Sequence, residues 1–65
     1  MKPHQERVVQ ERKDLDEKIA KLDEFIDGEI FKTLPKDEQD RLVAQSAAMT
    51  NYSDILHARI SAFED

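Results

Sequence analysis

Two arginines, a tyrosine and a glutamine interrupt otherwise apolar rows of this sequence, and these four residues could bind a ligand. They are Arg12, Gln45, Tyr52 and Arg59. An arginine presents a planar fork of N–H donors that matches phosphate oxygens, and a tyrosine ring offers a face on which a nucleic-acid base can stack. Together they would suit an anionic ligand that contains an aromatic ring, with Gln45 as the weakest candidate.

A structural explanation competes with the binding site. An arginine at the edge of a helical bundle commonly lays its stem along apolar surface and sends its charged head to water. Arg12 and Arg59 could therefore pair with nearby acids, while Tyr52 keeps its hydroxyl group at the rim. The residues alone favour this structural explanation over a binding site.

Catalytic and metal-binding patterns are absent from the sequence. It contains no glycine-rich phosphate loop, no His-Glu-x-x-His motif and no nucleophile placed beside a base. It has no cysteine and two isolated histidines, His4 and His57, so disulfides are excluded and a structural zinc site is not expected. The acidic stretch from Asp14 to Lys18 is expected to be a solvated helix face. We therefore expect no enzyme, no metal site and no cofactor.

Length and charge narrow the classes of protein further. The 65 residues make one domain, 1–65, and a chain this short is marginally stable by itself. Self-association is then the favoured source of stability. A net charge of −5 argues against a protein that binds DNA or RNA. No apolar run approaches the ~20 residues of a membrane span, the charged N-terminus is not typical of a signal peptide, and the lack of cysteine fits a reducing cytoplasm.

Apolar residues recur at helical spacing in two segments that would position the candidate side chains. They are Val8, Leu15, Ile19, Leu22 and Ile26 in the first segment, and Leu42, Met49, Leu56 and Phe63 in the second. Pro3 can open the first helix, Gly28 can end it in the left-handed capping conformation, and Pro35 opens the second. The pattern predicts helix 1 over about 4–27, a linker over 28–34 and helix 2 over about 35–63.

The predicted fold is all-α, an antiparallel two-helix hairpin. Two such hairpins would form a four-helix bundle and bury the apolar rows that one hairpin leaves half-exposed. Folding the hairpin about Phe31 would place Arg12 level with residues 52–56. Arg12, Tyr52 and Arg59 would then gather at the open end of the hairpin, and a symmetric dimer would duplicate them.

Two long segments of the chain resemble a family of phage proteins. They are "ERVVQERKDLDEKIAKLDEFI" and "LPKDEQDRLVAQSAAMTNYSDILHARI", and they resemble small phage-encoded proteins of unknown function related to a crAss-like phage protein. The matching positions are Arg7, Glu11, Leu15, Asp16, Lys18, Pro35, Gln39, Leu42, Gln45, Met49, Tyr52, Ser53, Leu56, Arg59 and Ile60. In size and helical content the chain is also similar to phage antidefence proteins that act as nucleotide sponges, although this analogy rests on no shared motif.

The resemblance implies a phage-encoded, non-catalytic antidefence protein. It would sequester a cyclic or modified nucleotide, an immune second messenger, as a homodimer or higher homo-oligomer in the host cytoplasm. Arg12 and Arg59 would hold phosphates, and Tyr52 would stack on or hydrogen-bond to a base. The alternative is an acidic helical inhibitor that binds a host or defence protein through exposed acids such as Asp16, Asp23 and Glu24. A minor structural or regulatory phage component is a third hypothesis.

Overall fold

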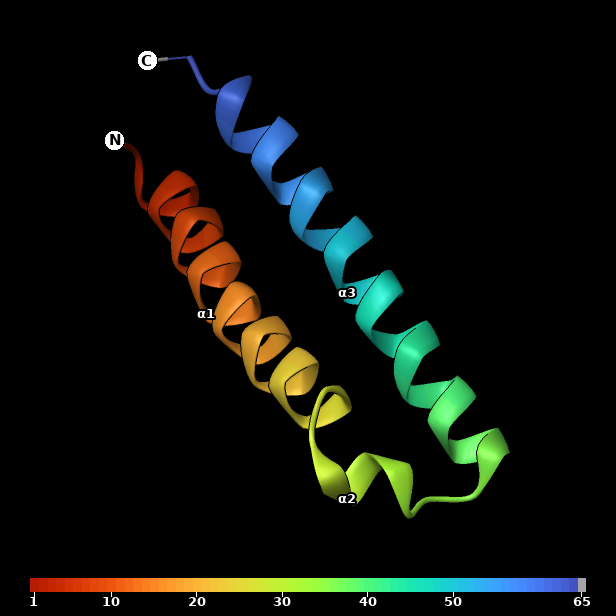
Figure 1. Cartoon of the computed structure of the whole chain (residues 1–65). Helices are drawn as coiled ribbons and strands as arrows, with labels where there is room; N and C mark the ends of the chain where they lie inside the picture. The colour runs from red at the N-terminus through yellow and green to blue at the C-terminus, as the bar shows by residue number, and fades with distance from the viewer. Residues whose placement is uncertain (65) are drawn as a thin grey trace.

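The computed structural model describes residues 1–64, and within them the chain has three helices and no strand. Helix α1 spans Pro3–Ile26, α2 spans Glu29–Lys32 and α3 spans Lys36–Ser61. α1 and α3 lie side by side and run in opposite directions, so both chain ends lie at one end of the molecule and α2 lies at the other (Figure 1). The result is a rod of 49 × 14 × 13 Å.

The predicted all-α class is confirmed, but the predicted linker contains a third helix. α2 occupies the middle of the segment 28–34. None of the described helices is long and apolar enough to cross a membrane.

The helix starts follow from local chemistry. α1 begins after Lys2 with Pro3 in its first turn, where the missing N–H of proline costs no intrahelical hydrogen bond. The Gln5 side chain accepts a hydrogen bond of 2.9 Å from the Lys2 backbone N–H, so it satisfies one of the free donors at this end. α3 begins after Pro35 with two acids in its first turn, near the positive end of the helix dipole.

Gly28 does not adopt the left-handed conformation expected of it. Its φ is −91° and its ψ is 175°, which is extended backbone, and it immediately precedes the first residue of α2. α1 ends at Ile26, and the backbone N–H of its C-cap residue Asp27 donates to the carbonyl oxygen of Asp23 over 3.1 Å. The expectation was wrong because the chain leaves α1 by entering a second short helix, and that path requires no positive φ.

A short apolar core lies between α1 and α3. Its buried members are Val8, Leu15 and Leu56, and the half-buried Ile19, Met49, Ile60 and Phe63 pack against them. Leu56 is 0% exposed. Most of the remaining apolar side chains are only half-covered, so one copy of the chain buries little hydrophobic surface.

Candidate ligand-binding grooves

Two open grooves flank the line of contact between α1 and α3. The first has a volume of about 560 Å³ and is lined by Val9, Arg12, Lys13, Asp16, Glu17, Ala20 and Ile60. The second has a volume of about 450 Å³ and is lined by Arg7, Gln10, Glu11, Asp14, Leu15, Lys18 and Tyr52. We name them the Arg12 groove and the Tyr52 groove. Their α1 residues lie on opposite sides of the row that faces α3, so the grooves are separate.

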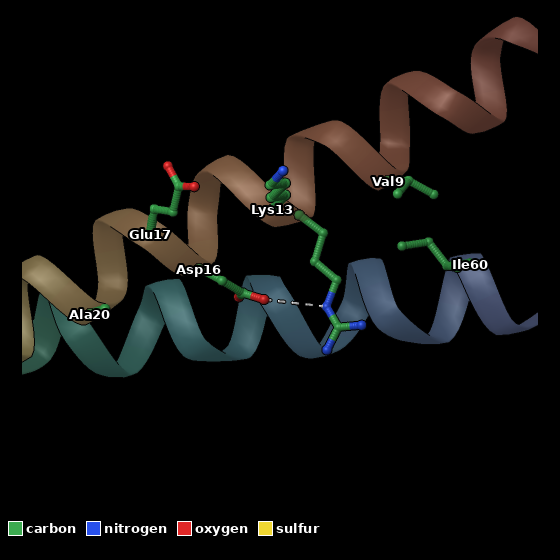
Figure 2. Close-up of a pocket in the computed structure, with 7 residues that line it drawn as sticks. Val9, Lys13, Asp16, Glu17, Ala20 and Ile60 are labelled. Atoms are coloured by element: carbon green, nitrogen blue, oxygen red, sulfur yellow. Dashed lines mark ion pairs between the residues drawn. The ribbon is translucent and has the colours of Figure 1, made fainter.

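The Arg12 groove combines an apolar mouth with charges of both signs. Figure 2 shows Val9 of α1 and Ile60 of α3 pointing toward one another across the groove. Lys13 and Glu17 point away from α3, whereas Asp16 points toward it (Figure 2). Lys13 and Glu17 therefore line the groove from its α1 side, with their charged heads turned away from α3.

Arg12 has partners on both helices. Its Nη1 atom lies 2.7 Å from Nδ1 of His57, and its Nε atom lies 3.6 Å from Oδ2 of Asp16. Because arginine only donates, His57 Nδ1 accepts this bond. The second carboxylate oxygen of Asp16 accepts a hydrogen bond from the buried hydroxyl group of Ser53. These contacts join α1 to α3, which is the behaviour that the structural explanation of Arg12 predicts.

One polar atom in this network lacks a hydrogen bond. The Nε atom of Arg12 is buried and has no hydrogen-bond partner among the described residues. The 3.6 Å separation from Asp16 is an ion-pair distance, longer than the 2.7–3.2 Å of an N–H···O hydrogen bond. Arg12 thus keeps one donor free inside the protein, while its Nη1 atom is engaged by His57.

The Tyr52 groove places an aromatic ring beside two cations. Tyr52 is 42% exposed, and Arg7 and Lys18 of α1 line the same groove. Neither cation forms an ion pair with any acid in residues 1–64. Two acids, Glu11 and Asp14, share the groove, and Asp14 already accepts a hydrogen bond from Gln10. An exposed ring next to free positive charge is the arrangement that an aromatic anion requires.

The register of the two long helices places the remaining candidates. Ser53 meets Asp16, Ser46 meets Asp23, and His57 meets Arg12, and the residue numbers of each pair add up to 69. Residues on α1 and α3 whose numbers have this sum are therefore level with one another. Arg59 is then level with Gln10, which lines the Tyr52 groove, whereas Gln45 lies level with Glu24, beyond the groove.

The four residues proposed from the sequence are thus divided between two sides of the molecule. Gln45 and Arg59 stand seven residues before and after Tyr52, so these three exposed side chains share one side of α3. Arg12 lies in the other groove. Within one chain the expected gathering of Arg12, Tyr52 and Arg59 does not occur, because Arg12 and Tyr52 lie on opposite sides of the helix contact.

Sequence reasoning missed the two cations of the Tyr52 groove. It searched the apolar rows for polar residues, whereas Arg7 and Lys18 lie outside those rows. A signal was present, since Arg7, Glu11, Asp14 and Lys18 follow one another at steps of four, three and four, and therefore share one side of α1. What the spacing could not show is that Tyr52 faces this side.

Comparison with known proteins identifies a family for the chain. Residues 2–62 match the Sequestin family, so the match includes all three helices and both grooves. No curated protein and no solved structure matches the chain. The family match fits the resemblance to phage proteins that sequester nucleotides, and it indicates a binding protein rather than an enzyme.

Proposed function

Because the chain belongs to the Sequestin family, we propose that it sequesters a cyclic or modified nucleotide that carries an immune signal in a phage-infected cell. It would act without catalysis, as a homo-oligomer of the four-helix-bundle type, in the host cytoplasm. The observation that carries this proposal is the family match over residues 2–62. The Tyr52 groove supports it with suitable chemistry.

The ligand-binding roles follow from the surroundings of each side chain. The ring of Tyr52 would stack on a base, a contact worth about 1–3 kcal/mol per base in proteins that bind single-stranded nucleic acids. Arg59, level with the groove, would offer its fork to a phosphate, and Arg7 and Lys18 would add positive charge from α1. Gln45 would contribute from beyond the groove. Arg12 is a weaker candidate than Arg59, because His57 and Asp16 already engage its guanidinium group.

The alternative, an acidic inhibitor of a host or defence protein, has less support in the structure. Two of the acids on which it depends, Asp16 and Asp23, accept hydrogen bonds from Ser53 and Ser46 of α3. They therefore act within the chain and are less available to a protein partner. The net charge of −5 is the observation that still favours this alternative.

A thermal-shift panel tests the proposed function. The panel contains cyclic dinucleotides, cyclic trinucleotides, cyclic ADP-ribose isomers and their linear forms. A ligand at a hundred times its Kd stabilises the folded state by about 2.7 kcal/mol, which raises the Tm of so small a domain by at least ~10 °C. We expect one selective ligand. If no nucleotide of the panel raises the Tm of a well-folded sample, this result would contradict the proposal and favour a protein partner.

Substitutions then test the site. Arg59→Ala and Tyr52→Ala should each abolish binding of the selected nucleotide, because they remove the proposed phosphate contact and the stacking face. Lys32→Ala is the matched control, since it also removes one positive charge but lies on α2, at the far end of the rod. Circular dichroism should show equal helicity in all three. Normal binding by the Arg59 and Tyr52 variants would show that the ligand lies elsewhere.

A further inference from the structure

Helix α3 carries a stretch without charge that is unusual in this chain. Charged residues make up 38% of the sequence, yet residues 42–53 contain no Asp, Glu, Lys or Arg. Within this uncharged band the residues that face α1 are Leu42, Ser46, Met49 and Ser53, and the other eight are exposed. Exposed surface depleted of charge is typical of the centre of a protein–protein interface.

One side of the uncharged band continues as a second row of coiled-coil spacing. This outer row is Gln45, Ala48, Tyr52, Ile55, Arg59 and Ala62, with steps of three and four residues in alternation. It is distinct from the row that packs on α1, and its largest members are well exposed, with Ile55 at 51% and Tyr52 at 42%. Ala44 borders the row and Ala48 lies within it, so a second helix can approach closely.

A single copy of the chain exposes more surface than a compact monomer of the same mass. One copy exposes 4951 Å², whereas a compact monomer of 7.6 kDa exposes about 4,300 Å². The excess of roughly 650 Å² is close to the ~800 Å² that each partner buries in an interface of standard size. A second copy packed on the uncharged band would therefore cover the surface that a single copy leaves open.

We propose that the outer row of α3 packs antiparallel on the outer row of a second copy of this chain, about a two-fold axis near Ala48. Ala44 and Tyr52 lie four residues on either side of Ala48, so each Tyr52 ring would stand opposite a small residue. Arg59, eleven residues after Ala48, would come opposite the partner subunit's Asp37, eleven residues before it. Parallel pairing would instead place Arg41 and Arg59 beside their own copies, which like-charge repulsion disfavours.

This contact would also complete the Tyr52 groove. Tyr52 belongs both to the outer row and to the groove, and the groove is open in one copy. A partner helix beside Tyr52 would fix its ring and narrow access of water to Arg7 and Lys18, which strengthens their attraction for an anion. The self-association stands by itself, whereas this shared site rests on the proposed function.

The oligomeric state in solution tests the contact. Sedimentation equilibrium of the wild-type chain should give twice the mass of 7.6 kDa. Ala48→Glu should give a helical monomer, because it places two like charges beside one another at the two-fold axis. Val43→Glu is the matched control, since it also adds a negative charge at an exposed position of α3 but on a different side, and it should leave the dimer intact. A wild-type monomer, or dissociation by Val43→Glu and not by Ala48→Glu, would overturn the proposal.

A cross-link provides a positive test of the axis. The chain has no cysteine, so Ala48→Cys introduces a single thiol group. Two such thiols near a two-fold axis meet the Cα separation of about 4.4–6.8 Å that a disulfide needs, and oxidation should convert this variant to covalent dimer. Val43→Cys should not cross-link. The reverse result would place the contact on the Val43 side and overturn the proposal.

Measurements of nucleotide binding test the shared site and the proposed function separately. The Ala48→Glu monomer should lose most of its affinity for the nucleotide that the wild type binds. Full affinity in this monomer would overturn the shared site and leave the proposed function intact. A wild-type dimer that binds no nucleotide of the panel would overturn the proposed function and support the contact alone.

Discussion

Ser46 and Ser53 make the same hydrogen bond in different surroundings. Each hydroxyl group, on α3, donates to a carboxylate oxygen of an aspartate on α1, Asp23 in one case and Asp16 in the other. Ser53 is buried, with 6% of its surface exposed, whereas Ser46 is half-buried. A hydrogen bond to a charged group is worth about 1.5–3 kcal/mol, and less where water can replace the donor. Comparing the two serines therefore shows how burial changes the contribution of this hydrogen bond to stability.

Ser53→Ala should lower the free energy of unfolding by about 1–2 kcal/mol, because the hydrogen bond to the charged Asp16 forms at a buried hydroxyl group, although the Asp16 side chain itself is 48% exposed. Ser46→Ala should lower it by less than about 0.5 kcal/mol, since water reaches Asp23. Both substitutions gain the same helix propensity, so the difference between them reports burial. Urea unfolding followed by circular dichroism measures both. Equal losses would mean that the buried position adds nothing to the bond.

Leu56 is the residue on which the intrachain core depends most. It is 0% exposed, and Leu56→Ala should cost about 3–5 kcal/mol because the emptied space cannot collapse fully. A domain of this size has a total stability of the same order, so the variant should be largely unfolded at 25 °C. Val43→Ala, at a position 51% exposed, is the control and should retain full helicity. A folded Leu56→Ala variant would show that another contact holds the helices together.

At the scale of the elements, the long helices were predictable and the turn was not. The apolar rows extend over several turns, so their period identifies a helix and the side that it buries. α2 has four residues, too few for any period to show, and its residues Ile30 and Phe31 read equally well as a loop that closes the bundle. Gly28 was interpreted through its most common role, and a glycine before a helix gives the same signal in a sequence.

The candidate site was predictable only in part for a related reason. A spacing of seven residues places Gln45, Tyr52 and Arg59 on one side of α3, and this spacing is visible in the sequence alone. Whether Arg12 joins them depends on how α1 and α3 rotate about their axes. A rotation of one residue, 100°, moves a side chain from one groove to the other. Hydrogen bonds between the helices, such as Arg12 to His57, select the rotation, and no local pattern encodes them.

Gly28→Ala should change the free energy of unfolding by less than about 0.5 kcal/mol, because the φ of −91° suits any residue. A Cβ atom at this position would lie 3.3 Å from the carbonyl oxygen of Phe25, a tight contact that offsets the entropy gained by removing a glycine. A glycine in the left-handed conformation would lose more than this on the same substitution. Thermal unfolding of the variant distinguishes the two. A loss above about 1 kcal/mol would indicate that the turn needs a conformation reserved for glycine.

At the scale of the whole molecule, the two long sides of the rod differ in the contacts that their residues make. The Arg12 side joins α1 to α3 through polar contacts, and its groove contains a guanidinium group already engaged by the chain. The Tyr52 side keeps two cations without ion-pair partners in residues 1–64, an exposed ring and the outer row. The proposed ligand binding and self-association would therefore lie on the side opposite to the polar contacts that stabilise one copy. Substitutions on one side should therefore affect the other only weakly.

The stability of the wild-type chain should depend on its concentration. If the folded state is a dimer, a hundredfold rise in chain concentration favours it by about 2.7 kcal/mol per dimer, and the Tm rises accordingly. The Tm of the Ala48→Glu variant should not change over the same range, because a monomer unfolds without a change in the number of molecules. Calorimetry at several concentrations measures both. A wild-type Tm independent of concentration would mean that the short core of Val8, Leu15 and Leu56 suffices alone, and that the uncharged band of α3 faces a partner other than a second copy.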